Sequence, residues 1–211
     1  MHRFLVPRQP HGNVVFNFTR RPVDDLTAFA LGYREAGRIL AAKMAAANGY
    51  ADYDGYPILF LYRHALELYL KAIVYRGAQL SDLISEEAIG TNRLFERHDL
   101  ARLLPAIEAI FRQMSWDFEG SGLDSYEDFA DFIRTIDTVD RGSYAFRYPV
   151  NRVGVAPLPQ HFTVNAVEFS QSMEILLRFL EGAATGITES WHAEAEARYE
   201  LQQLAAEWNE A

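Results

Sequence analysis

Hydrophobic and polar positions along this chain follow the helical repeat, and no stretch alternates with the two-residue period of a strand for long enough to build a sheet. The most apolar stretch, residues 56–76, is hydrophobic on nearly every face, which predicts a buried central helix. Amphipathic patterns predict further helices over about 23–48, 98–114, 125–139, 164–184 and 189–208. Five or six helices without strands predict an all-α, up-and-down helical bundle.

Glycine and proline positions predict where these helices end. Gly77 indicates the end of the central helix, and Gly186 separates the last two helical patterns. Pro105 lies inside the 98–114 pattern, where it predicts either a kink or a later helix start. Residues 142–161 contain three prolines and predict a long loop, and loops of that length in compact domains are often functional.

The pattern divides the chain into three parts. Residues 1–22 predict an irregular N-terminal arm, and residues 23–184 predict a helical domain. Residues 185–211 predict an extra C-terminal helix that is acidic and amphipathic. This last helix either folds back on the bundle or docks a second subunit, and the sequence leaves both options open.

Three charged residues recur at intervals of four inside the apolar central stretch: Arg63, Glu67 and Lys71. On a helix they form one row, and buried charges need partners. One interpretation is a structural ion-pair ladder that also holds the loop around Arg147. The other is a ligand site, in which Arg63, Lys71 and Arg147 bind a phosphate or another acidic group. The structural ladder is the favoured interpretation.

Composition narrows the choice of function. The net charge of −9 argues against a protein coated with basic surface for duplex DNA. The absence of cysteine excludes disulfides, thiolate metal sites and a cysteine nucleophile. No run approaches the roughly 20 apolar residues of a membrane span, and the N-terminus lacks a signal-peptide core, so we expect a cytoplasmic protein without a membrane partner.

Three short motifs occur in order along the chain: YRHALELYLKA (62–72), RHDLARL (97–103) and FRYP (146–149). Together they resemble the HEPN superfamily of helical bundles, over roughly residues 23–184. The resemblance implies a bundle that is often homodimeric. It also implies one of two roles: an RNA-cleaving toxin or bacterial defence factor, or a non-catalytic antitoxin partner, nucleotide-binding module or scaffold. No cofactor is expected.

The ribonucleases of this superfamily resemble one another in an R-x4-6-H motif at the start of the last core helix. In this chain Arg93 and His98 have that spacing, but they precede a different helix. The resemblance therefore suggests His98 as a catalytic residue, assisted by Arg93 or Arg97. A histidine base beside arginines that stabilise a phosphorane-like charge suits RNA cleavage. The alternative is that His98 caps its helix or bonds to the central helix.

The remaining candidates form a ligand-binding set for RNA, a nucleotide or a protein partner. His64 is next to Arg63 but about 100° round the helix, and a satisfied interior histidine is the alternative for it. Tyr148 precedes a proline, which favours extended backbone there. Aromatic side chains could stack on bases, although a packed rim is expected more often. The full ligand-binding set is Arg63, His64, Glu67, Lys71, Arg147 and Tyr148, and the aromatic set is Tyr50, Tyr53, Tyr56, Tyr144, Phe146 and Tyr148.

A metal-dependent phosphohydrolase is the weakest alternative. His64 and the His98-Asp99 pair, with Asp124 or Asp137, supply ligand types that suit a hard or borderline metal. In HD phosphohydrolases, however, the HD pair follows an apolar run and a glycine comes shortly after, and ERHDLARLL has neither. We expect no metal site.

Overall fold

The structure is a computed structural model that describes residues 14–15, 23–47, 51–80, 94–151 and 153–210. The described residues form helices and contain no strand, which confirms the predicted all-α class for this part of the chain. The α-helices are α1 (Leu26–Ala46), α2 (Gly55–Leu80), α5 (Leu104–Gln113), α6 (Tyr126–Val139) and α7 (Ala166–Glu210), and the 3₁₀ helices are η1 (Asp52–Asp54) and η2 (Leu100–Leu103).

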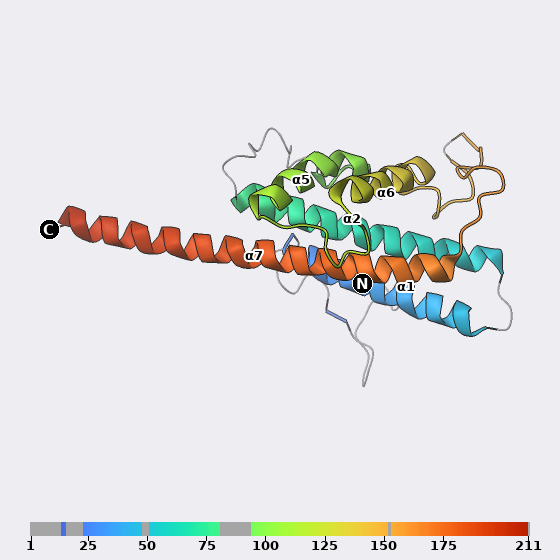
Figure 1. Cartoon of the computed structure of the whole chain (residues 1–211), viewed down its shortest axis with the longest axis horizontal. Helices are drawn as coiled ribbons and strands as arrows, with labels where there is room; N and C mark the ends of the chain where they lie inside the picture. The colour runs from blue at the N-terminus through green and yellow to red at the C-terminus, as the bar shows by residue number, and fades with distance from the viewer. Residues whose placement is uncertain (1–13, 16–22, 48–50, 81–93, 152, 211) are drawn as a thin grey trace, which may run out of the picture.

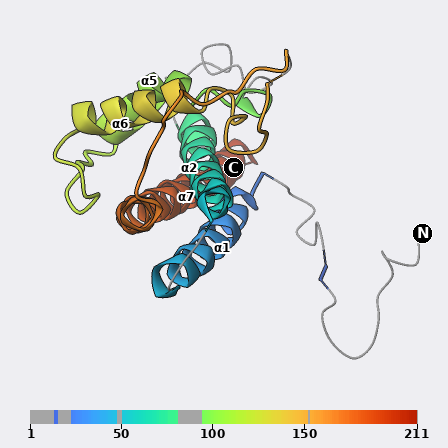
Figure 2. The same ribbon diagram turned by 90° about the vertical axis from the view of Figure 1, so that its right-hand side faces the viewer.

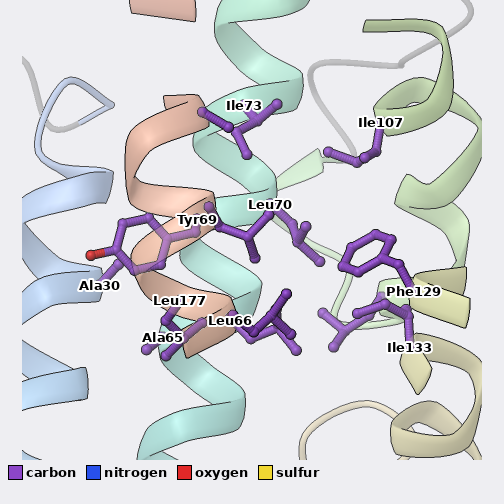
Figure 3. Packing of buried hydrophobic residues seen from close by; sticks show 14 of the residues in the cluster. Ala30, Ala65, Leu66, Tyr69, Leu70, Ile73, Ile107, Phe129, Ile133 and Leu177 are labelled. Atoms are coloured by element: carbon purple, nitrogen blue, oxygen red, sulfur yellow. The ribbon is translucent and has the colours of Figure 1, made fainter. Parts of the chain in front are cut away.

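Helix α2 lies at the centre of the molecule. The long helices α1 and α7 run along one side of it, and the shorter α5 and α6 cover the other side (Figures 1 and 2). Buried side chains therefore leave α2 in several directions. Tyr69 points toward α1, whereas Leu66 and Leu70 point toward Phe129 and Ile133 (Figure 3). The prediction of a central helix that is apolar all round is confirmed.

Two of the predicted helix boundaries change for steric reasons. Helix α2 does not end near Gly77 but continues to Leu80, and Gly77 is buried against α5. A Cβ atom at Gly77 would lie 2.3 Å from Cδ1 of Ile110, so this glycine permits close helix packing rather than a helix end. Pro105 moves the start of the next helix: η2 comes first, and α5 begins at Leu104 with the proline in its first turn.

The predicted break after Gly186 is wrong, because α7 is one continuous helix of 45 residues. At about 1.5 Å per residue it is about 67 Å long. Gly186 packs inside it against the ring of Trp116, which would lie 3.1 Å from a Cβ atom. One internal glycine costs a helix only about 1 kcal/mol relative to alanine, which does not end a helix that packs along the bundle. Its C-terminal end projects past the other described helices (Figure 1).

Some of the other predicted segments lie among the described residues, and some lie outside them. Helix α6 begins one residue after Ser125, whose side chain accepts a hydrogen bond from the backbone N–H of Asp128. No helix occurs in the described part of residues 142–161, as predicted. Most of the arm 1–22 and residue Arg93 lie outside the described residues. Among the described helices, none has the length and hydropathy needed to cross a membrane.

Candidate functional site

The predicted charged row exists and is buried on α2. Arg63 Nη1 lies 2.8 Å from Glu67 Oε2, and Lys71 Nζ lies 2.7 Å from Glu67 Oε1. The three side chains are 1–5 % exposed. Glu67 is therefore an anion held between two cations, each one helical turn away.

Residues from the loop that follows α6 and from the segment before η2 complete this row. Arg63 Nε faces Asp140 Oδ2 at 3.0 Å, and Arg63 Nη2 donates to the backbone carbonyl of His98 at 2.7 Å. Asp140 also accepts a hydrogen bond from the N–H of Ala145 at 2.6 Å, which fixes the start of the 142–161 loop. Arg63 thus joins α2 to two segments that have no regular helix of their own. We call this set, Arg63, Glu67, Lys71, Asp140 and His98, the α6-side network.

The carboxylates of Glu67 and Asp137 have pKa shifts in opposite directions. Burial by itself would raise the pKa of Glu67, but the charges and hydrogen bonds of Lys71, Arg63 and His98 outweigh it and lower the pKa to about 2. Burial raises the pKa of Asp137, although it accepts the N–H groups of Leu100 and Ala101 at 3.0 and 2.6 Å. Those two hydrogen bonds hold the first turn of η2.

His98 is the member of the α6-side network that reaches solvent. Its Nδ1 lies 2.8 Å from Glu67 Oε1, and its side chain is 45 % exposed. A buried carboxylate that contacts one ring nitrogen fixes the orientation of an imidazole. The arrangement leaves Nε2 as the nitrogen for an external partner, which is the geometry of a general base.

His64 and Arg147 lie beside this histidine. The His64 ring is stacked on Phe60, and the Arg147 guanidinium lies 5.6 Å from the centre of the same Phe60 ring. Burial lowers the pKa of His64, Glu67 opposes this shift, and the positive charges of Arg63, Arg147 and His98 add to it. We call His64, His98, Arg147 and the exposed Tyr148 the His98 corner.

The structure brings together most of the predicted site residues. The ladder was predicted to hold the loop around Arg147, and Asp140 makes that tie, because it faces Arg63 Nε and accepts the N–H of Ala145. Arg147 Nε donates to the carbonyl of Ser143 in its own loop. Arg97 is exposed next to His98. Asp140 was missed because it is a loop residue far from the row in sequence. Its only signal was its position at the end of the predicted 125–139 helix.

Three of the aromatic side chains in the predicted set are exposed: Tyr53, Tyr56 and Tyr148 are 73, 43 and 48 % exposed. The rings of Tyr144 and Tyr148 lie 4.6 Å apart. Near the start of α2 is a pocket of about 620 Å³, whose aromatic lining residues are Tyr56, Phe146 and Phe162.

A second buried polar network, which sequence reasoning missed, lies on the opposite side of α2. Arg34 of α1 contacts Glu174 at 2.9 Å and Glu181 at 2.8 Å, both on α7, and the hydroxyl of Tyr62 donates to Glu174 at 2.9 Å. We call Arg34, Tyr62, Glu174 and Glu181 the α7-side network. Its signal in the sequence is an arginine that follows the helical spacing of small buried residues at Ala30 and Gly37.

Two further findings bear on identity. Among the described residues, no group of three or more His, Asp or Glu side chains is arranged to hold a metal ion. His64, His98 and Asp99, the predicted alternative, therefore do not form such a group. No protein-family model, no curated protein and no solved structure matches this chain.

Proposed function

We propose that this protein is a HEPN-like helical-bundle module that binds single-stranded RNA or a nucleotide at the His98 corner. The observation that carries the proposal is the contact between the buried Glu67 carboxylate and the half-exposed His98 ring. The same contact is the bond to the central helix that the structural alternative for His98 predicted, but that alternative does not need the ring to reach solvent. A ligand site does, because an oriented imidazole can donate to a phosphate or take a proton from a hydroxyl.

The surroundings of His98 suit a single strand. Arg147 is an exposed cation, and Tyr148 offers a ring for base stacking, which is worth about 1–3 kcal/mol per base in single-strand binding proteins. The overall charge of −9 limits the electrostatic attraction to this local patch. We therefore expect weak, salt-sensitive binding of a few nucleotides.

Cleavage of RNA is the catalytic form of this proposal, and the Glu67–His98 contact favours it. His98 Nε2 would take the proton of a ribose 2′-hydroxyl, and the 2′-oxygen would attack the adjacent phosphorus. The bond from phosphorus to the 5′-oxygen then breaks, and the proton returns to that oxygen. The products are a 2′,3′-cyclic phosphate and a 5′-hydroxyl. Arg147, and Arg97 beside His98, would stabilise the charge on the phosphorane.

The assembly and setting of the protein remain proposals that rest on the resemblance. It implies a homodimer, a protein partner such as the other member of a toxin–antitoxin pair, and a role in bacterial defence. A cytoplasmic location stays a prediction, and the cysteine-free composition is compatible with it. Sedimentation velocity over a range of protein concentrations tests the homodimer directly.

A non-catalytic structural or interaction module is the second candidate. The observation in its favour is that Arg63 and Lys71 are enclosed and paired with carboxylates, so that neither cation faces a ligand. This candidate predicts that substitutions in the α6-side network change stability alone.

Fluorescence anisotropy with a labelled oligouridylate of about ten nucleotides separates the two candidates. We expect Arg147→Ala to weaken binding by about tenfold, because loss of one well-placed contact costs about 1.4 kcal/mol. Arg112→Ala is the matched control, since Arg112 is an exposed arginine at the far end of α5. Equal effects of the two substitutions, or no RNA binding by the wild-type protein, would sink the proposal.

Cleavage is read from the same oligonucleotide on a denaturing gel. We expect His98→Gln to abolish any cleavage while circular dichroism shows that the protein keeps its fold. Cleavage that survives this substitution removes His98 from the reaction and leaves only the binding form of the proposal.

A further inference from the structure

The C-terminal end of α7 stands outside the bundle. Ile187 is its last fully buried side chain, and every side chain from Ala195 to Trp208 is exposed. Figure 1 shows this end projecting well past the other helices. Because an isolated helix of this length is marginal in water, it gains most from a partner that covers it.

One face of the projecting helix is apolar. Ala197, Leu201, Leu204 and Trp208 follow spacings of four, three and four, which places them in a single line that we call the free stripe. Leu201, Leu204 and Trp208 are 66, 54 and 85 % exposed. An exposed line of large apolar side chains is typical of an interaction surface.

One flank of the free stripe is acidic. Glu189, Glu196, Glu200 and Glu207 follow spacings of seven, four and seven, so they form a row about 80° round the helix from the stripe. Residues 189–208 contain five glutamates and one arginine, which gives this segment a net charge of −4. In paired helices, charges that flank the apolar seam select the partner.

We propose that the free stripe binds a helix of a partner protein whose own apolar stripe is flanked by lysine and arginine. The charge of the row argues for a basic partner, since opposite charges along a seam attract and orient the two helices. The same charge argues against a second copy of this chain, because two segments that each have a net charge of −4 would repel one another. The inference does not depend on what the His98 corner binds.

Two designed helical peptides test this inference against the full-length protein. Both carry the same leucine stripe, and one has lysine and the other glutamate at the flanking positions. We expect fluorescence anisotropy to give at least about tenfold tighter binding of the lysine peptide. Its affinity should fall as sodium chloride rises from about 50 to about 300 mM.

Variants of the projecting helix locate the binding surface. We expect Leu201→Ser to weaken binding of the lysine peptide by about tenfold or more. Tyr199→Ser is the matched control, because Tyr199 is 62 % exposed on the opposite face of the same helix, and we expect it to change the affinity less than about twofold. Glu200→Gln should weaken binding and flatten its salt dependence. Circular dichroism confirms that each variant keeps its helix content.

Four outcomes would overturn the inference. The first is that the lysine peptide does not bind, and the second is that the glutamate peptide binds equally well. The third is that Tyr199→Ser weakens binding as much as Leu201→Ser. The fourth is that the protein sediments as a dimer that Leu201→Ser dissociates, which would assign the free stripe to a second copy.

Discussion

The two buried polar networks on opposite sides of α2 are built in opposite ways. The α6-side network has an anion at its centre, Glu67, which is 1 % exposed and contacted by three partners. The α7-side network has a cation at its centre, Arg34, and its two glutamates are 19 and 38 % exposed at the rim. The first network therefore has its charge in the interior, and the second has part of its charge in water.

The networks also hold different kinds of structure. Arg34, Glu174 and Glu181 join α1 to α7, two long helices that already pack along α2. Arg63 and Asp140 instead hold the segment before η2 and the loop after α6. Helices keep their shape through their own backbone hydrogen bonds, whereas these loop segments rely on side chains. The His98 corner lies on the side that depends on side chains.

Removing the central carboxylate of the α6-side network should have the largest effect. Glu67→Ala leaves the buried Lys71 without its carboxylate and Arg63 with only Asp140 and Asp137, and we expect it to lower the free energy of unfolding by about 3–5 kcal/mol. Glu174→Ala should cost only about 1–2 kcal/mol, because Arg34 keeps Glu181 and the removed carboxylate is partly exposed at the rim. Urea unfolding of both variants measures this difference. Equal losses would contradict the contrast between the two networks.

Acid should weaken the α6-side network in a defined range. The folded-state pKa of Glu67 is about 2, below its usual value of 4.5, so its ionised form stabilises the folded state. This stability is present above about pH 5 and is lost as the pH falls toward 2, on the order of 3 kcal/mol in all. Asp137 acts in the opposite sense, because burial raises its pKa and its protonation in acid relieves a cost.

Urea unfolding at a series of pH values between 5 and 2 measures this loss. Glu67→Gln should flatten the dependence, since the amide does not titrate. Glu174→Gln is the control on the other side of α2. If both substitutions leave the same acid dependence as the wild type, Glu67 does not supply it.

Local patterns were enough to predict the helices and the charged row, because both depend on spacing within one segment. Arg63, Glu67 and Lys71 are in contact because four residues make about one turn. Asp140 and the carbonyl of His98 come from other segments, and the helical repeat carries no information about such contacts. The row and its tie to the loop around Arg147 were therefore predicted, whereas Asp140, the residue that makes the tie, was not.

The predicted helix ends at Gly77 and Gly186 were wrong for a related reason. At Gly77 and Gly186 the sequence suggests a helix end or break, but each lies where another element approaches closely: Ile110 in one case and Trp116 in the other. A glycine that permits a close approach and a glycine that ends a helix have the same local signal. Only the arrangement of the helices distinguishes them.

The close approach at Gly77 gives the next prediction. Gly77→Ala places a Cβ atom 2.3 Å from Ile110 Cδ1, and we expect a loss of about 1–3 kcal/mol as Ile110 is forced to another rotamer. Gly37→Ala, on the α1 side, meets the Tyr62 ring at 3.1 Å and should cost less. Thermal unfolding compares the two variants. In an Ile110→Ala background the cost of Gly77→Ala should nearly vanish, and a purely additive result would exclude this clash as its cause.

The smallest expected effect concerns the helix caps on the two sides of α2. Ser125 caps α6, and Asn165 caps α7 by accepting the N–H groups of Val167 and Glu168 at 3.1 Å. Alanine at either position should cost about 1 kcal/mol in urea unfolding. Because Asp137 lies on α6 more than two turns beyond Ser125, and Asp140 directly follows the helix, we expect hydrogen exchange in Ser125→Ala to rise in the first turn of α6 and to stay unchanged at Leu100 and Ala101. Faster exchange at those two amides would mean that the α6-side network depends on the whole of α6, and not on its own contacts.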